Sequence, residues 1–122
     1  MSTPYVYLVL RSDLPIEQQI VQAAHSAHQA GRLYPAPIDT HLILLEAKHE
    51  SQLQKISNDL TDLNIQHHMF HEPDYDTGYT SITTEPITDR ALRKYFSRYS
   101  LYRYRADSFE VKTNLTKLGE LQ

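Results

Sequence analysis

The first half of the chain holds two largely apolar runs, at 5–10 and 41–46, in which β-branched, aromatic and leucine side chains dominate. Runs of this length without strict polar alternation are typical of strands that are covered on both faces of a sheet. Residues 15–30 lie between them and are expected to form a helix. Glu17 is near its start, where the positive end of a helix favours an acid. The order strand, helix, strand predicts a crossover that joins two parallel strands.

Residues that favour helix ends flank this first helix. A side chain that accepts from the first backbone N–H groups stabilises a helix start, and glycine readily adopts the left-handed conformation found at helix ends. We therefore expect Ser12 or Asp13 to cap the helix and Gly31 to end it. Pro15 falls where the first turn tolerates proline.

The second half of the chain continues the alternation. Leucine and isoleucine recur at helical spacing over 49–63, with charges and amides between them, which predicts an amphipathic helix. Thr88 or Asp89 is expected to cap a third helix that runs to about Tyr99. Further short strands are expected at 66–70, 80–84 and 101–104. The pattern predicts one α/β domain over 1–122, with a mixed sheet of four or five strands flanked by helices.

Composition narrows the class of protein. The chain has 122 residues, of which 40% are hydrophobic, and no cysteine. This rules out disulfides, thiolate chemistry and cysteine-based metal sites, and it fits a reducing compartment. No apolar run reaches the roughly 18 residues that a membrane span needs, and no basic segment followed by an apolar one opens the chain. We expect a cytoplasmic protein without a membrane partner.

The first helix carries a polar file. Gln22, His25 and His28 are three residues apart, so they share one side of the helix, and alanines beside them leave room for close packing. Such a file is a candidate site. Packing against the sheet, with His25 bonded to a backbone carbonyl, explains it equally well.

A second feature is a basic and aromatic stretch between residues 86 and 105, where half of the basic side chains of this acidic protein occur against a single acid. Guanidinium groups interleaved with tyrosines suit phosphates and stacked bases. The candidate nucleic-acid contacts are Arg90, Arg93, Lys94, Arg98 and Arg103, and Arg105 belongs to the same stretch. The alternative is a solvated helix and edge strand whose tyrosines belong to the core or to a dimer contact.

These segments resemble the type II peptidyl-tRNA hydrolases over roughly residues 4 to 86. The likeness rests on the run 22–27, which is similar to the family's Gln-x-x-His-Ala helix motif, and on 76–80, which is similar to its Asp-Ala-Gly-Arg-Thr loop before a strand that ends in proline, here Pro86. The resemblance implies a mixed sheet flanked by helices, often in a homodimer. It also implies hydrolysis of the ester between a peptide and tRNA, without a metal or other cofactor.

The chain departs from the family at one position above all. The family's lysine, in the first helical turn, falls on Gln18, a neutral amide. The loop is also shorter, so two alignments compete: Asp76 supplies the acid in one, and the segment 72–74, with Asp74, supplies it in the other. The resemblance then implies that an acid orients the attacking water and that Thr80 positions the carbonyl.

In the same scheme the oxyanion donor is Gln18, Gln22 or His25. Three functions follow from these residues: a divergent peptidyl-tRNA hydrolase, a non-catalytic tRNA- or RNA-binding module on the same fold, and a small dimerisation domain.

Seven histidines also raise a metal hypothesis. We expect no metal site, because histidines without cysteine or a tight spacing signature are usually surface or core residues.

Overall fold

The computed structural model describes residues 3–103, and their strands form a mixed four-stranded sheet in the order β2-β1-β4-β3. β1 (Tyr5–Arg11) pairs in parallel with β2 (His41–Ala47) and antiparallel with β4 (Gly78–Thr84). β3 (His67–Glu72) forms the other edge, antiparallel to β4. The predicted α/β class, the central position of the first strand and the parallel crossover are confirmed.

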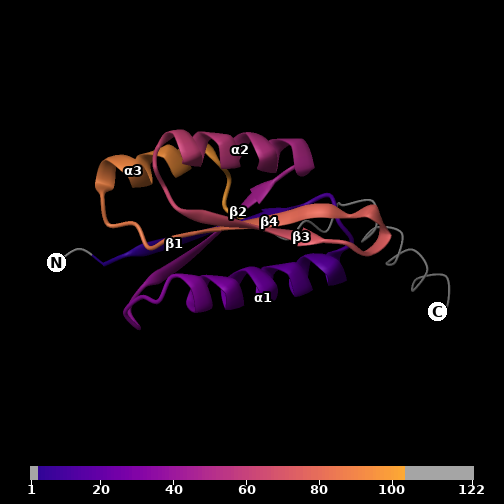
Figure 1. The fold of residues 1–122 in the computed structure, drawn as a ribbon, viewed down its shortest axis with the longest axis horizontal. Helices are drawn as coiled ribbons and strands as arrows, with labels where there is room; N and C mark the ends of the chain where they lie inside the picture. Colours follow the sequence, from indigo (N-terminus) through magenta and orange to yellow (C-terminus); the bar gives the residue numbers. More distant parts are fainter. Residues whose placement is uncertain (1–2, 104–122) are drawn as a thin grey trace, which may run out of the picture.

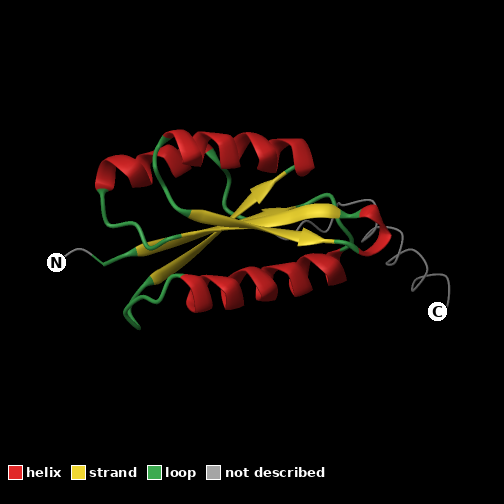
Figure 2. Cartoon of the chain, viewed as in Figure 1, coloured by secondary structure: helices red, strands yellow, loops and turns green. Residues whose placement is uncertain are grey.

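Helices cover both faces of this sheet (Figures 1 and 2). α1 (Ile16–Leu33) lies on one face, and α2 (Glu50–Asp62) lies on the other together with α3 (Arg90–Tyr95). Two short 3-10 turns complete the described chain: η1 (Asp74–Asp76) joins β3 to β4, and η2 (Phe96–Arg98) continues α3. No helix among residues 3–103 is long and apolar enough to cross a membrane.

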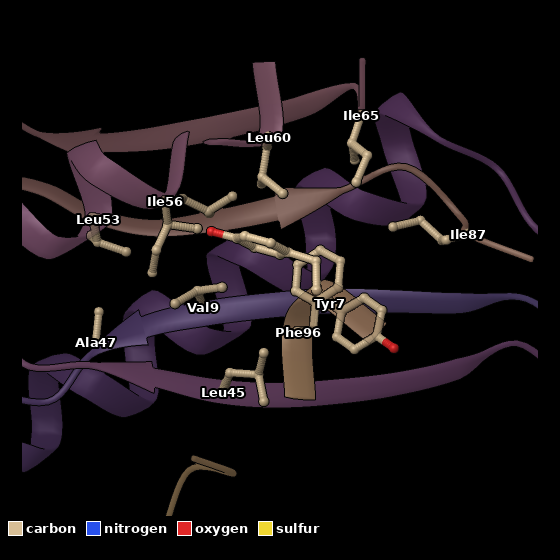
Figure 3. Close-up of a cluster of buried hydrophobic side chains, with 12 residues drawn as sticks. Tyr7, Val9, Leu45, Ala47, Leu53, Ile56, Leu60, Ile65, Ile87 and Phe96 are labelled. Atoms are coloured by element: carbon tan, nitrogen blue, oxygen red, sulfur yellow. The ribbon is translucent and has the colours of Figure 1, made fainter. Parts of the chain in front are cut away.

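The main apolar core lies between the sheet and α2, with α3 and η2 closing one end (Figure 3). Leu53, Ile56 and Leu60 on one side of α2 are fully buried, as the helical spacing predicted. Phe96 stacks on Tyr7 with ring centroids 3.8 Å apart, which fixes η2 against β1. The α1 face has a much smaller apolar cluster of Val6, Leu8 and Ala30.

Two sequence expectations about the ends of α1 are wrong. Neither Ser12 nor Asp13 caps α1: Pro15 precedes the first turn without a side-chain bond, and Asp13 instead pairs with Arg11. Gly31 does not end the helix, which continues to Leu33, because glycine only permits a stop and nothing here requires one.

The expected fifth strand is reduced to a single bridge in the described chain. Leu101 pairs antiparallel with Leu45 at the outer edge of β2, flanked by backbone hydrogen bonds from Glu46 to Ser100 and from Tyr102 to Leu44. The third helix is shorter than predicted, since α3 gives way to η2 before Tyr99, although Asp89 caps it as expected by accepting from Ala91. Residues 104 and 105 of the predicted strand and basic stretch lie outside the described residues.

Truncating Leu53 tests the main core. Leu53 is fully buried, so Leu53→Ala should lower the free energy of unfolding by about 2–5 kcal/mol through lost burial and a cavity. The control is Ile20→Ala on α1, where the side chain is 65% exposed and the change should stay within about 0.5 kcal/mol. Urea denaturation measures both, and equal effects would contradict the assignment of the core.

The end of α2 is tied to α3 by a polar contact. The Tyr95 hydroxyl donates to the Asp59 carboxylate at 2.7 Å, and Lys55 donates to the same carboxylate at 3.1 Å. These bonds, the one from Tyr95 first, lower the pKa of the Asp59 carboxyl below its usual 3.8. Burial, with hydrogen bonds to Tyr99 and Asp59, raises the pKa of the Tyr95 phenol.

This contact predicts a pH dependence. Because folding lowers the pKa of Asp59, its ionised form stabilises the folded protein at neutral pH, and that contribution is lost as the pH falls below 3.8 through the folded-state value. Tyr95→Phe should move the Asp59 pKa back towards 3.8 and reduce the acid-dependent part of the stability. A carboxyl NMR titration checks the shift. Tyr99→Phe keeps the bond to Asp59 and should leave the pKa lowered; an unchanged pKa in Tyr95→Phe would refute the cause.

Candidate functional site

A buried polar layer joins α1 to the strands beneath it. The Thr80 hydroxyl on β4 donates to the side-chain oxygen of Gln22 at 2.9 Å, and the amide nitrogen of Gln22 donates to the Glu72 carboxylate on β3 at 3.1 Å. Thr80 is fully buried and Gln22 nearly so. The layer continues one turn later, where the Ser26 hydroxyl donates to the Ile82 carbonyl at 3.4 Å. Both ends of the Gln22 amide are therefore occupied within the fold.

A β-bulge positions Thr80 for this contact. Phe70 pairs with Ser81, but the next residue of β3, His71, pairs with Tyr79, so Thr80 is the extra residue on β4. A bulge re-aims side chains at the point where it interrupts the ladder. The sequence signal for it was weak, because alternation along 80–84 alone does not reveal an inserted residue.

The other residues of the predicted helix file are more exposed. The His25 ring stacks on Phe70 with centroids 4.8 Å apart and planes 14° apart, at the surface of the molecule. His28 is exposed, and Gln18 is half-buried one helical turn before Gln22. Gln22 and Thr80 are thus in contact, His25 lies above Phe70 beside them, and Gln18 continues the same file.

Both candidate acids lie in the exposed turn that follows β3. The Asp74 backbone N–H donates to the Glu72 carboxylate at 3.2 Å, which connects the turn to the polar layer. Asp76 has a φ of 54°, in the left-handed region, and neither aspartate side chain bonds to another described residue. Arg11 holds the far side of the turn by donating to the carbonyls of Thr77 and Tyr79.

A polar groove lies at the carboxyl ends of β1 and β2. Ser12 directly follows β1 and Lys48 directly follows β2, and ligands of open α/β sheets commonly bind outside such strand ends. The groove consists of two adjoining hollows, of about 510 and 400 Å³, that share Glu46 and Ser100. Its lining residues are Ser12, Glu46, Lys48, Gln52, Arg98, Tyr99, Ser100, Leu101 and Arg103.

Three cations line this groove: Lys48, Arg98 and Arg103. Arg98 is fixed by a bond from its Nε to the Tyr95 carbonyl at 3.0 Å, with its guanidinium over the Tyr95 ring. Because Arg98 is already fixed, its guanidinium can bind an anion without further ordering of the side chain.

The predicted nucleic-acid residues therefore divide into groups. Arg98 and Arg103 belong to the polar groove. Arg93 lines a further hollow, among the rings of Tyr5, Tyr7 and Phe96. Arg90 and Lys94 are exposed on α3 and line none of these hollows.

Gln19 ties the start of α1 to the turn after β1 and to the segment after η2. Its amide nitrogen donates to the carbonyls of Ser12 and Leu14, which closes the turn from β1 into α1. Its oxygen accepts from the Tyr102 hydroxyl at 2.6 Å, which ties the segment after η2 to the first turn of α1. Ser12, which lines the groove, is therefore bonded to a residue of α1 three positions before Gln22 of the polar layer.

Three of these residues are not indicated by any motif in the sequence. Glu72 belongs to the alternative acidic segment 72–74, but its carboxylate is the one bonded to Gln22. Gln19 has no motif of its own, and Lys48 is isolated in the sequence. Only the position directly after a parallel strand signalled Lys48.

Within residues 3–103 no group of three or more His, Cys, Asp or Glu side chains is placed to hold a metal ion. His67, one of the histidines behind the metal hypothesis, instead bonds to Ser57 and to the Ile65 carbonyl.

Comparison with known proteins adds a fold likeness. No family model matches the chain, and neither does any curated protein. Among solved structures, a protein of unknown function from Agrobacterium tumefaciens superposes with a TM-score of 0.60 at 14% sequence identity, over 84% of this chain and all of that one. At this identity the likeness shows a shared fold and nothing about activity. Residues 3–103 form a small α/β domain with a four-stranded mixed sheet and three helices.

Replacing Thr80 tests the polar layer. Thr80→Val keeps the shape but leaves the buried oxygen of Gln22 without its donor, which should lower the free energy of unfolding by about 1–3 kcal/mol. Thr83→Val is the matched control, because the Thr83 hydroxyl is equally buried and has no partner among the described residues. Thermal or urea denaturation should show that variant to be unchanged or more stable. The same loss in both variants would mean that the Gln22 bond contributes nothing.

Proposed function

We propose that this chain is a divergent relative of the type II peptidyl-tRNA hydrolases that binds the acylated end of a tRNA in the polar groove. The observation that carries the proposal is the bonded series Thr80, Gln22 and Glu72. It brings the helix motif and the loop region, the two parts of the resemblance, into contact across 50 or more residues of sequence.

The charges around the groove favour an anionic ligand, because three cations among its lining residues outnumber the single acid, Glu46. Lys48, Arg98 and Arg103 line a groove of two hollows that together are large enough for a sugar–phosphate unit. Phosphate contacts of this kind supply most of the affinity of RNA-binding proteins and make it depend on salt. Ser12 at the groove is bonded to Gln19 in the first turn of α1, and the resemblance puts the family's active-site lysine in that same turn.

Hydrolysis of the ester is the second candidate, favoured by the exposed carboxylates of Asp74 and Asp76 at the turn next to Glu72. In this reaction a water attacks the ester carbonyl, the bond to the ribose oxygen breaks, and that oxygen takes up a proton. Two features predict slow turnover. Gln18 supplies no charge to the developing oxyanion, and the Gln22 amide is already bonded on both sides.

Salt-dependent binding tests the proposed function. We expect N-acetylaminoacyl-tRNA to bind with a steep slope of log affinity against log salt, and Lys48→Gln and Arg98→Gln each to reduce that slope by about one phosphate contact. Lys94→Gln removes the same charge from an exposed position outside the groove and should leave the slope nearly unchanged. Equal effects of all three substitutions, or no binding, would contradict the groove as the RNA site.

The same samples test hydrolysis. Release of the N-acetylamino acid should be slow, insensitive to EDTA, and reduced further by Asp74→Asn or Asp76→Asn, whichever residue orients the water. Turnover that both substitutions leave unchanged would exclude this mechanism, and binding without turnover would assign the chain to the non-catalytic class.

A further inference from the structure

A further hollow adjoins the polar groove at Tyr99 and Leu101 and lies over β1 and β2 on the face that carries α3. It has a volume of about 370 Å³ and is lined mainly by rings and aliphatic side chains. Tyr7 and Phe96, stacked on each other, form part of its wall beside Leu45 (Figure 3). We call it the aromatic hollow, and its defining residues are Tyr5, Tyr7, Arg93, Phe96, Tyr99 and Leu101.

Arg93 supplies the polar chemistry of the aromatic hollow. Its guanidinium lies 4.4 Å over the Tyr5 ring and makes no hydrogen bond or ion pair with any other described residue. A guanidinium carries five N–H donors in a rigid plane, and its Nε is buried here without a partner. No acidic side chain lines the aromatic hollow, so these donors face a wall of rings instead of a carboxylate.

This combination defines a class of ligand. A flat, π-rich ring gains from stacking on tyrosine and phenylalanine, and its acceptor atoms gain from a planar set of donors at its edge. A nucleobase has both properties, and guanine offers the O6 and N7 pair that arginine binds in a bidentate manner. The volume falls in the range of small-ligand pockets, roughly 300–1,000 Å³. Leu101, 65% exposed at the rim, would be covered by such a ring.

From these contacts we infer that the aromatic hollow binds a nucleobase, with Arg93 reading its acceptor edge. Tyr99 lines both the aromatic hollow and the polar groove, so a base in one and its phosphate in the other fit neighbouring parts of one strand. The pairing of a base in the aromatic hollow with a phosphate in the polar groove rests on the proposed function, whereas base binding by the aromatic hollow alone does not.

The test compares two RNA hexamers of equal charge. One carries a single guanosine among uridines, and the other has an abasic ribose in place of the guanosine. Fluorescence anisotropy should show at least tenfold tighter binding of the guanosine hexamer to the wild-type protein. Equal affinities for the two hexamers would overturn the inference, and this comparison needs no variant.

Two arginine variants locate the effect. Arg93→Gln should abolish the preference for guanosine, whereas Arg90→Gln, which removes the same charge from the exposed side of α3, should lower both affinities equally and keep the preference. If Arg93→Gln fails to fold, Tyr5→Leu takes its place, because Tyr5 lines the aromatic hollow and not the polar groove, and it should weaken only the guanosine hexamer. Loss of the preference in Arg90→Gln as well would overturn the assignment to Arg93.

Competition by GMP identifies the source of the base. Displacement of the hexamer by GMP at similar concentration supports a free nucleotide as ligand, and displacement only by RNA supports a base within a strand. Displacement by neither would overturn base binding. Failure of the groove is separately visible, because Lys48→Gln and Arg98→Gln would then leave tRNA affinity unchanged while the guanosine preference persisted.

Discussion

The hydrogen bonds that Gln22 makes to Thr80 and Glu72 are the constraint on which this side of the molecule depends. Buried amides and hydroxyls are costly unless they are paired, so α1 packs on the sheet only in the register that pairs them. That register also sets the place of Gln19, which closes the turn after β1 and holds Tyr102. Neighbouring residues of one helix thus join the polar layer to Ser12 of the polar groove and to the segment after η2.

The two faces of the sheet are stabilised by different kinds of contact. The α2 face holds the large apolar cluster, including Leu53, Ile56 and Ile82, which is typical of the burial that stabilises a small domain. The α1 face has only a small apolar cluster and relies on polar contacts. Because most of the apolar core lies on one face, the other can carry amides, hydroxyls and carboxylates beside the strand ends without loss of the fold.

Most of the fold followed from the sequence because apolar periodicity is a strong signal, as over 49–63. The errors fall where tertiary contacts decide. Glycine permits but does not enforce a helix end, so Gly31 misled, and the bulge at Thr80 depends on pairing between strands. The functional residues are harder to predict than the fold. The sequence pattern indicates Gln22 and Thr80, but Glu72 belongs to the polar layer, and Lys48 to the polar groove, only through spatial proximity, which no motif records.

Amide NMR shifts of labelled protein, titrated with an N-acetylaminoacyl minihelix that carries a tRNA acceptor end, report directly on whether the polar groove binds RNA. We expect saturable shifts centred on Lys48, Arg98 and Arg103, extending to the first turns of α1. Shifts confined to the exposed side of α3, around Arg90, or none at all, would contradict it.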